Sequence, residues 1–183
     1  VYQRPIFLYV GRVAVEKNIE DFLTLNLPGT KVVVGDGPQR KVLERKYPAV
    51  AFLGLKEGEA LAQIYASADV FVFPSRTDTF GLVLLEALAS GVPVAAYPVT
   101  GPLDVIGDHP AGVLDENLEK AAEKALKLDP ADCRDYAMNF SWATSATQFK
   151  DNLVIFTSAK NASATLQSSE ETENLDPEYI LKK

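Results

Sequence analysis

Short apolar runs alternate with helical patterns along most of this chain. Each apolar run has the length of a strand and is continuously hydrophobic rather than alternating with polar positions, which is typical of a parallel sheet covered on both faces. We therefore predict an α/β fold, a Rossmann-like, doubly wound parallel sheet of about six strands with helices on both faces. The predicted strands lie within residues 5–11, 31–35, 49–54, 69–75, 92–98 and 111–114, and helical patterns follow within 19–26, 38–47, 58–68, 80–90 and 117–128.

The carboxyl-terminal part of the chain contains clear boundary signals. Asp129-Pro130 ends one helical pattern before the segment "ADCRDYAMNF", and Ser141 is expected to cap a last helix. Few large apolar side chains follow. We predict one Rossmann-like domain over residues 1–156 and a polar, disordered tail over residues 157–183.

Composition and charge narrow the class of partner. Hydrophobic residues make up 47% of the chain and charged residues 23%, as in soluble globular proteins. The formal net charge of −7 does not favour binding to nucleic acid or to an anionic membrane surface. One cysteine, Cys133, excludes an internal disulfide, and the lone histidine, His109, is not expected to be a general base. We predict no metal, no resident cofactor and no nucleic-acid partner.

The ends of the chain and its hydropathy bear on localisation. No apolar run approaches the ~20 residues that cross a bilayer, and no signal-peptide pattern opens the chain. We expect a cytoplasmic protein. Because the first residue is Val1 rather than Met, we also expect the chain to be a piece of a longer protein.

Candidate chemistry gathers at the carboxyl ends of the predicted strands, where open parallel sheets bind ligands. Arg12 and Lys17 follow the first strand and could neutralise a diphosphate, although taken alone a solvated loop with two cations explains them better. Gly81 opens a helix, so the backbone can approach a ligand and the amides of Leu82 and Val83 can face an anion. Together these features predict a phosphate site.

Two acidic residues accompany that site. Glu86 lies among leucines and alanines, where an unpaired carboxylate would raise the free energy of the fold, so we expect it to be bonded. Its partner is either a neighbouring structural group or the hydroxyl pair of a ligand such as a ribose. Asp78, in the loop before the helix, caps that helix or accepts hydroxyls from a sugar. The GxGxxG and GxxxxGK[ST] patterns are absent, which disfavours a nicotinamide dehydrogenase and a P-loop ATPase.

Four motifs in order resemble a known family. "GRVAVEKN", "GDGPQ", "ADVFVFPSRTDTFGLVLLEALASGVPVAA" and "GPLDVI" are similar to the carboxyl-terminal, donor-binding domain of group-1 glycosyltransferases of family GT4. That family has the GT-B fold, with two facing Rossmann-like domains. The resemblance implies a retaining transferase that moves a sugar from a nucleotide diphosphate sugar to a glycan or lipid acceptor, usually without a metal.

The resemblance also implies a role for individual residues. Glu86 would bind the ribose hydroxyls, and Asp78 would hold the donor sugar. The family's first acid is usually Glu, and Gly commonly stands where this chain has Asn18, so the sugar contact and the loop after Lys17 are expected to differ. The remaining donor contacts would be Gly11, Arg12, Lys17, Leu82 and Val83 for the diphosphate, Thr79, Phe80 and Gly81 beside Asp78, and Leu53 and Gly54 near the nucleobase.

Three functions remain open at this point. The first is the donor domain of a transferase that is inactive without an N-terminal acceptor-binding domain. The second is a non-catalytic nucleotide-sugar-binding module, and the third is a GT-B sugar-nucleotide epimerase. We expect a UDP-sugar ahead of a GDP-sugar, a bacterial origin, a role in cell envelope polysaccharide or glycolipid synthesis, and peripheral membrane association only of the full-length protein.

Overall fold

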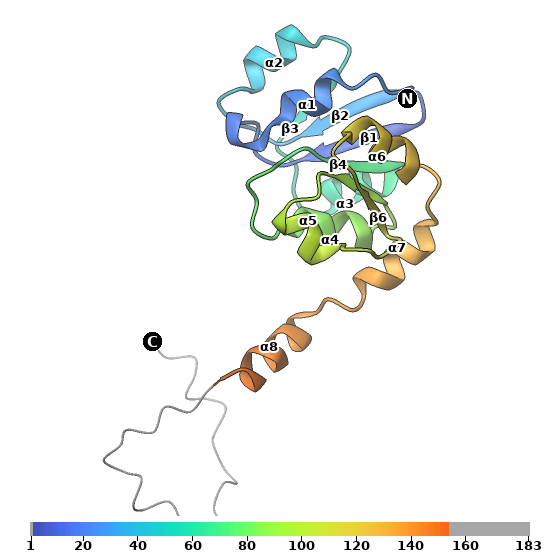
Figure 1. Ribbon diagram of the computed structural model, residues 1–183. Coiled ribbons are helices and arrows are strands. Elements are labelled where there is room, and N and C mark those ends of the chain that lie inside the picture. The colour runs from blue at the N-terminus through green and yellow to red at the C-terminus, as the bar shows by residue number, and fades with distance from the viewer. Residues whose placement is uncertain (1, 154–183) are drawn as a thin grey trace, which may run out of the picture. The chain divides into compact units, whose positions relative to one another are not determined.

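The computed structural model describes residues 2–153 and contains one parallel sheet (Figure 1). The strand order is β3-β2-β1-β4-β5-β6, and each pair of neighbours is parallel. The sheet confirms the predicted α/β, doubly wound class. The strands are β1 (Ile6–Val10), β2 (Thr30–Val34), β3 (Ala51–Gly54), β4 (Val70–Phe73), β5 (Val94–Ala96) and β6 (Gly112–Leu114).

Helices cover both faces of this sheet, which explains why its strands lack polar alternation. Successive residues of a strand point to opposite faces, so Leu8 packs in one apolar core with α3, α4 and α7, while Phe7 packs in a second core with α1, α2 and α6. The helices are η1 (Val15–Lys17), α1 (Ile19–Thr24), α2 (Arg40–Lys46), α3 (Gly58–Ser67), α4 (Leu82–Ala89), α5 (Thr100–Val105), α6 (Leu118–Ala125), α7 (Pro130–Ala137) and α8 (Trp142–Asp151).

The strand order reverses between β1 and β4. The chain runs outward from β1 to β2 and β3, then returns to pair β4 with the other side of β1 before continuing to β5 and β6. The loops after β1 and β4 therefore diverge to opposite faces and leave a crevice at the carboxyl ends of these strands. The predicted site residues come mainly from these two loops.

The predicted boundary signals act as caps. The Asp129 side chain accepts a hydrogen bond from the Ala131 amide at 2.8 Å, with Pro130 in the first turn of α7. Ser141 Oγ accepts from the Thr144 amide at 3.0 Å at the start of α8. The predicted tail over residues 157–183 lies outside the described residues. Within 2–153, no helix is long and apolar enough to cross a membrane.

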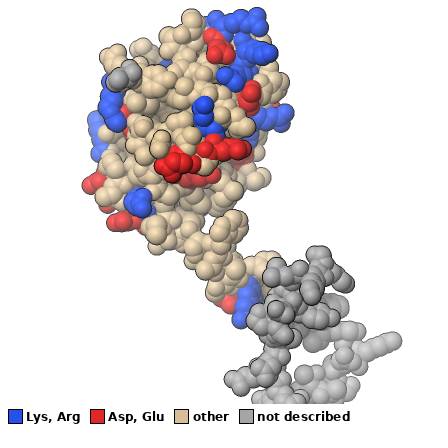
Figure 2. All heavy atoms as spheres, turned by 180° about the vertical axis from the view of Figure 1, so that it is seen from behind, with Lys and Arg blue, Asp and Glu red and all other residues tan. Residues whose placement is uncertain are grey.

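Charged residues of both signs share the surface of the domain. Figure 2 shows Lys and Arg side chains at the end where α2 lies, and Asp and Glu side chains across the middle of the same face. Helix α2 itself carries four basic residues in the sequence RKVLERK, and two of them form ion pairs, Arg40 with Asp36 and Lys46 with Glu20. This face therefore presents a mixed surface rather than a basic stripe.

Candidate functional site

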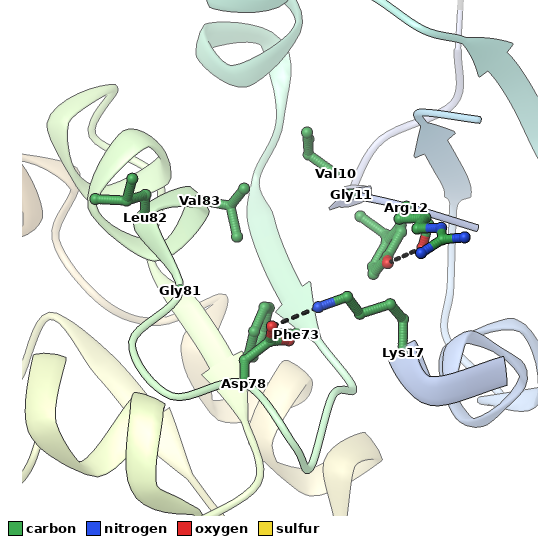
Figure 3. A pocket seen from close by; sticks show the side chains of 10 residues that line it. Val10, Gly11, Arg12, Lys17, Phe73, Asp78, Gly81, Leu82 and Val83 are labelled. Atoms are coloured by element: carbon green, nitrogen blue, oxygen red, sulfur yellow. Dashed lines mark hydrogen bonds and ion pairs between the residues drawn. The ribbon is translucent and has the colours of Figure 1, made fainter. Parts of the chain in front are cut away.

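A pocket of about 390 Å³ lies at the carboxyl ends of β1 and β4 (Figure 3). Its walls are the loop after β1, the loop after β4 and the first turn of α4. The structure thus brings together residues from two of the four motifs. The lining residues are Tyr9, Val10, Gly11, Arg12, Lys17, Phe73, Asp78, Gly81, Leu82 and Val83.

The first turn of α4 opens toward this pocket. Gly81 is the N-cap residue and has φ of 80°, a left-handed conformation that a residue with a side chain adopts at a cost. The first amides of a helix have no partner within the helix, so the N–H groups of Leu82 and Val83 belong to its positive end. Both residues line the pocket.

Lys17 and Asp78 face each other across the pocket. Lys17 Nζ and Asp78 Oδ1 form an ion pair, and each side chain is about a quarter exposed, 25% and 22%. The two residues come from segments that are 61 residues apart in the chain. The sequence predicts a different ligand contact for each, a diphosphate for Lys17 and a sugar for Asp78, and it does not anticipate their pairing.

The electrostatics of Asp78 favour its charged form. Burial alone would raise its pKa, but the hydrogen bond and charge of Lys17 outweigh burial and hold the pKa below its ordinary value. The nearby Ser75 hydroxyl acts in the same direction, although neither Ser75 Oγ nor Asp78 Oδ2 makes a hydrogen bond of normal geometry within the described residues. Oδ2 is therefore a buried oxygen whose nearest internal donor is Ser75.

Arg12 lies on the outer rim of the pocket. Its side chain is 65% exposed, and its guanidinium lies 3.5 Å from Glu16 Oε1. Its backbone is fixed more firmly, because the hydroxyl of buried Tyr9 donates to the Arg12 carbonyl at 2.9 Å. Burial, followed by the charges of Asp78 and Glu16, raises the pKa of Tyr9 far above its usual range, so this donor keeps its proton. Arg12 thus has an anchored backbone and an exposed charged end.

Glu86 lies in a second, adjoining pocket of about 390 Å³. Although Glu86 lies among leucines and alanines in the sequence, the residue is exposed, on the side of α4 that faces this pocket. The expected bond is present nonetheless, because the Tyr65 hydroxyl donates to Glu86 Oε2 at 2.9 Å. The two pockets share Val10, Gly11, Arg12 and Val83, so they form one continuous surface.

The far wall of the second pocket was not anticipated as a whole from the sequence. It consists of Leu55, Lys56, Glu57 and Leu61, together with Gly35 and Asp36 of the "GDGP" segment. The glycines of that segment permit a close approach of two loops. A Cβ at Gly35 would lie 1.9 Å from the Gly11 carbonyl oxygen, and one at Gly37 would lie 2.4 Å from that of Val13.

Several predicted contacts lie elsewhere. Leu53 lines neither pocket of the site, because the alternation along β3 turns its side chain toward α3, into a separate pocket with Leu8 and Val32. Gly54 ends β3, and its carbonyl accepts from the Gly35 amide at 2.9 Å without lining either pocket. The segment that follows Gly54 lines the second pocket instead, through Leu55, Lys56 and Glu57.

Thr79 and Phe80 also stay outside the two pockets. Both are exposed, and the loop they form packs against the start of α5, where a Cβ at Gly101 would lie 3.1 Å from the Phe80 carbonyl oxygen. His109 lines neither pocket; its ring stacks on Tyr136 at 3.7 Å. Within residues 2–153 no group of three acidic, histidine or cysteine residues could hold a metal ion.

Comparisons with known proteins agree with this architecture. Residues 4–129 match the family model described as "Glycosyl transferases group 1". Sulfoquinovosyl transferase SQD2 of Arabidopsis thaliana is 42% identical over 116 residues, which cover 60% of this chain and 22% of that protein. A GDP-mannose-dependent alpha-mannosyltransferase of Mycobacterium tuberculosis is 43% identical over 113 residues, or 61% of this chain and 30% of that protein.

Solved structures show the same relationship. Sucrose-phosphate synthase from Thermosynechococcus elongatus superimposes with a TM-score of 0.68 at 31% identity, over 80% of this chain and 44% of that one. The pneumococcal O-GlcNAc transferase crystallised with UDP and GlcNAc gives 0.66 at 23% identity, over 81% and 35%, a likeness in fold alone. This chain spans about a fifth to a third of the length of the curated relatives it matches. Because the family model covers more than half of the chain, the chain belongs to the group 1 glycosyl transferases.

Proposed function

We propose that this domain binds a nucleotide diphosphate sugar across the two joined pockets and serves as the donor-binding part of a retaining glycosyltransferase. The observation that carries the proposal is the linear order of groups along the site. The second pocket holds Glu86, the shared wall holds Gly11, Arg12 and Val83, and the first pocket holds Asp78. A ribose, a diphosphate and a sugar follow one another in the same order in such a donor.

Each segment of the site has chemistry suited to its part of the donor. A carboxylate such as Glu86 accepts two hydroxyl hydrogen bonds from a ribose. The guanidinium of Arg12 and the amides at the start of α4 bind diphosphate oxygens. The carboxylate of Asp78, which lines the first pocket, accepts a hydroxyl of the sugar. The nucleobase then lies toward residues 55–57.

The same groups support transfer. When the bond between the sugar and the diphosphate breaks, negative charge develops on the leaving diphosphate. Arg12, Lys17 and the positive end of α4 stabilise that charge without rearranging, because the fold already holds their backbone in place. The catalysis supplied by this domain is therefore electrostatic and needs no metal ion.

The identity of the donor is a separate part of the proposal. The sequence favours a UDP-sugar, with UDP-glucose first. Three relatives at 41–43% identity carry GDP-mannose in their names, which makes GDP-mannose the rival to compare directly. The acceptor, a glycan or lipid, and an N-terminal acceptor-binding domain are expected to complete the enzyme, in the cytoplasm or at the inner face of its membrane.

A binding module without catalysis uses the same residues, so it is the second candidate function. The long relatives favour the transferase, because this chain covers at most about a third of them. A GT-B epimerase is the third candidate. Hydrolysis or epimerisation of the donor by the full-length protein, without transfer to any acceptor, would favour it over the transferase.

Calorimetric titration of this chain with UDP, GDP, UDP-glucose and GDP-mannose tests the proposal. We expect one nucleotide and its sugar conjugate to bind, and Arg12→Ala and Glu86→Ala to weaken that binding at least tenfold. Arg45→Ala is the matched control, because this arginine lies on α2 and contacts only the Lys41 carbonyl among the hydrogen bonds of the described residues. Wild-type protein that binds none of the four at millimolar concentration would contradict the proposal.

A further inference from the structure

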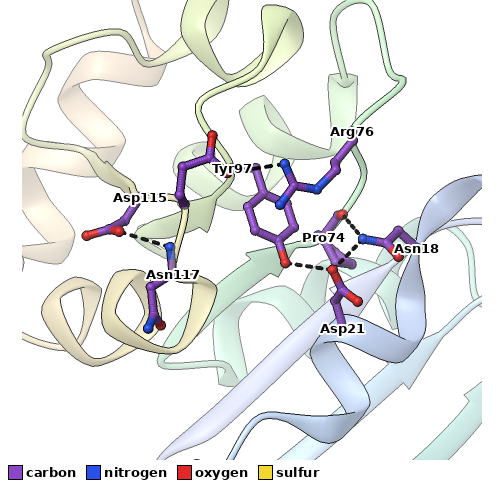
Figure 4. A network of polar contacts seen from close by, with 8 residues as sticks. Asn18, Asp21, Pro74, Arg76, Tyr97, Asp115 and Asn117 are labelled. Carbon is purple, nitrogen blue, oxygen red and sulfur yellow. Dashed lines mark hydrogen bonds and ion pairs between the residues drawn. The ribbon is translucent and has the colours of Figure 1, made fainter.

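A network of polar contacts joins the turn that contains Asn18 to the loop that begins at Pro74 (Figure 4). Asn18 follows Lys17 and has φ of 51°, the only positive φ of a non-glycine residue among those described. Asparagine tolerates this left-handed conformation better than most residues. The turn therefore keeps the backbone for which the resemblance expects glycine, and it gains a side chain. The Asn18 amide Nδ2 donates to Asp21 Oδ2 at 2.6 Å and to the Pro74 carbonyl at 3.3 Å.

Contacts of this kind join two segments that each carry one member of the ion pair. Besides the pair itself and the bond from Asn18 to Pro74, the hydroxyl of Thr77 donates to the Glu16 carbonyl at 3.2 Å. The turn at residues 15–18 and the loop at residues 74–78 are thus linked at three points. Neither segment belongs to a strand, so these contacts set their spacing.

Tyr97, directly after β5, adds a further hydrogen bond to the network. Its hydroxyl donates to Asp21 Oδ2 at 2.7 Å, the same oxygen that accepts from Asn18. The Arg76 guanidinium lies 3.6 Å over the Tyr97 ring. Burial first, and then the bond to Asp21 and its charge, raise the pKa of Tyr97 to about 12 against an opposing effect of Arg76. The phenol therefore stays protonated and remains a donor at neutral pH.

We infer that Asn18 and Tyr97 are positioning residues for donor binding, which act through Asp21 to hold the 15–18 turn against the 74–78 loop and keep Lys17 opposite Asp78. The inference rests on the proposed function, in which Lys17 contacts the diphosphate and Asp78 contacts the sugar. A lysine carries its charge on a long flexible stem, and ordering that stem opposes binding. We call the contacts of Asn18 and Tyr97 with Asp21 the brace. Because the brace orders the Lys17 side chain before a ligand binds, it increases affinity without touching the ligand.

Amide hydrogen exchange in the free protein tests the brace without any ligand. Tyr97→Phe removes one hydroxyl, and Asn18→Gly keeps the left-handed turn while removing the amide. We expect Tyr97→Phe, which loses one hydrogen bond, to speed exchange at residues 75–80 by about fivefold, and Asn18→Gly, which loses two, to speed it at least as much. Tyr47→Phe is the matched control, because its hydroxyl donates to Glu20 on the same helix α1 at 2.9 Å. Unchanged exchange in Tyr97→Phe and Asn18→Gly would overturn the inference.

A double-mutant cycle then tests whether the brace acts through Lys17. Calorimetry with UDP and GDP should show that Tyr97→Phe weakens the bound nucleotide about fivefold in the wild-type background and has no effect in Lys17→Ala. Equal weakening in both backgrounds would indicate general destabilisation and would overturn the positioning role. If the wild type binds neither nucleotide, the proposed function fails, and the positioning role fails with it. Faster amide exchange in Tyr97→Phe and Asn18→Gly would still show in that case that the brace exists in the free protein.

Discussion

Tyr65 donates a hydrogen bond of 2.9 Å to Glu86 Oε2, although the tyrosine is only 2% exposed and Glu86 lies at the surface. The bond joins α3 to α4. Burial, followed by the charge of Glu86 and the bond itself, raises the pKa of Tyr65 far above its usual value, so the hydroxyl keeps its proton. One carboxylate oxygen is held by the protein, and no hydrogen bond within residues 2–153 occupies the other.

This relationship makes Tyr65→Phe a selective probe of the ribose contact. The change leaves the ring and its packing against Phe71 and removes only the hydroxyl. We expect nucleoside diphosphate binding to weaken about three- to tenfold, because Glu86 loses the bond that orients it. Binding of a 2′,3′-dideoxy nucleotide, measured by calorimetry, should change much less.

The matched control for that experiment is Tyr136→Phe. Its hydroxyl donates to the Val105 carbonyl at 2.7 Å, on a helix that lines neither pocket. It should leave both affinities unchanged. If Tyr65→Phe weakened the natural and dideoxy nucleotides to the same extent, the tyrosine would not act through a ribose contact.

The fold could be predicted from the sequence because the apolar pattern that indicates it is repeated in every strand. Each strand is apolar on both faces, so every strand contributed independent evidence for a covered parallel sheet. Caps were equally local: Asp129 and Ser141 each act within a few residues of themselves. Such features need no knowledge of distant parts of the chain.

The candidate site was only partly predictable, since it depends on pairings between distant residues. Residue types at strand ends indicated Arg12 and Lys17, and a glycine indicated the start of α4. The ion pair between Lys17 and Asp78 joins residues 61 apart, a contact that no local pattern encodes. The misplacement of Leu53 has a related cause, because strand alternation decides its direction only when the register of β3 in the sheet is known.

Stability should depend on the ionisation of Asp78. Its pKa in the folded protein lies below the ordinary value of 3.8, so the ion pair contributes stability above that pH, and the contribution is lost as pH falls through the folded pKa. We expect Asp78→Asn to destabilise the protein by about 1 kcal/mol near neutral pH, reduced by solvent at a pair that is a quarter exposed. Thermal unfolding should show the difference shrinking below about pH 4.

Asp104→Asn serves as its control, because the described part of the chain shows no ion pair for Asp104. It should shift the unfolding temperature little at any pH. A difference between wild type and Asp78→Asn that stayed constant down to strongly acidic solution would show that the carboxylate charge of Asp78 does not stabilise the fold.

Gly35→Ala should destabilise the domain through the approach of two loops at the site. Gly35 has φ of 129°, and an added Cβ would lie 1.9 Å from the Gly11 carbonyl oxygen. We expect a loss of about 2–4 kcal/mol in the free energy of unfolding, measured in urea. Gly58→Ala separates strain from overlap: its φ is 54°, and nothing lies within 4 Å of the added atom. Gly58→Ala should lower the free energy of unfolding by only about 1 kcal/mol. Equal losses in the two variants would show that the close approach of Gly35 to Gly11 does not contribute to the effect.

Arg12 should affect affinity without affecting stability. Its side chain is 65% exposed and meets only Glu16, at 3.5 Å, among the ion pairs of residues 2–153, so Arg12→Ala should change the free energy of unfolding by no more than about 0.5 kcal/mol. Nucleoside diphosphate affinity should fall about tenfold, the effect of one charge-assisted contact. Glu16→Gln removes the internal competitor for the guanidinium, so it should leave affinity unchanged or raise it slightly.

Calorimetry at two salt concentrations checks the charge contribution, because screening should weaken wild-type binding more than binding by Arg12→Ala. Equal salt sensitivity in the two proteins would show that the guanidinium does not meet the diphosphate.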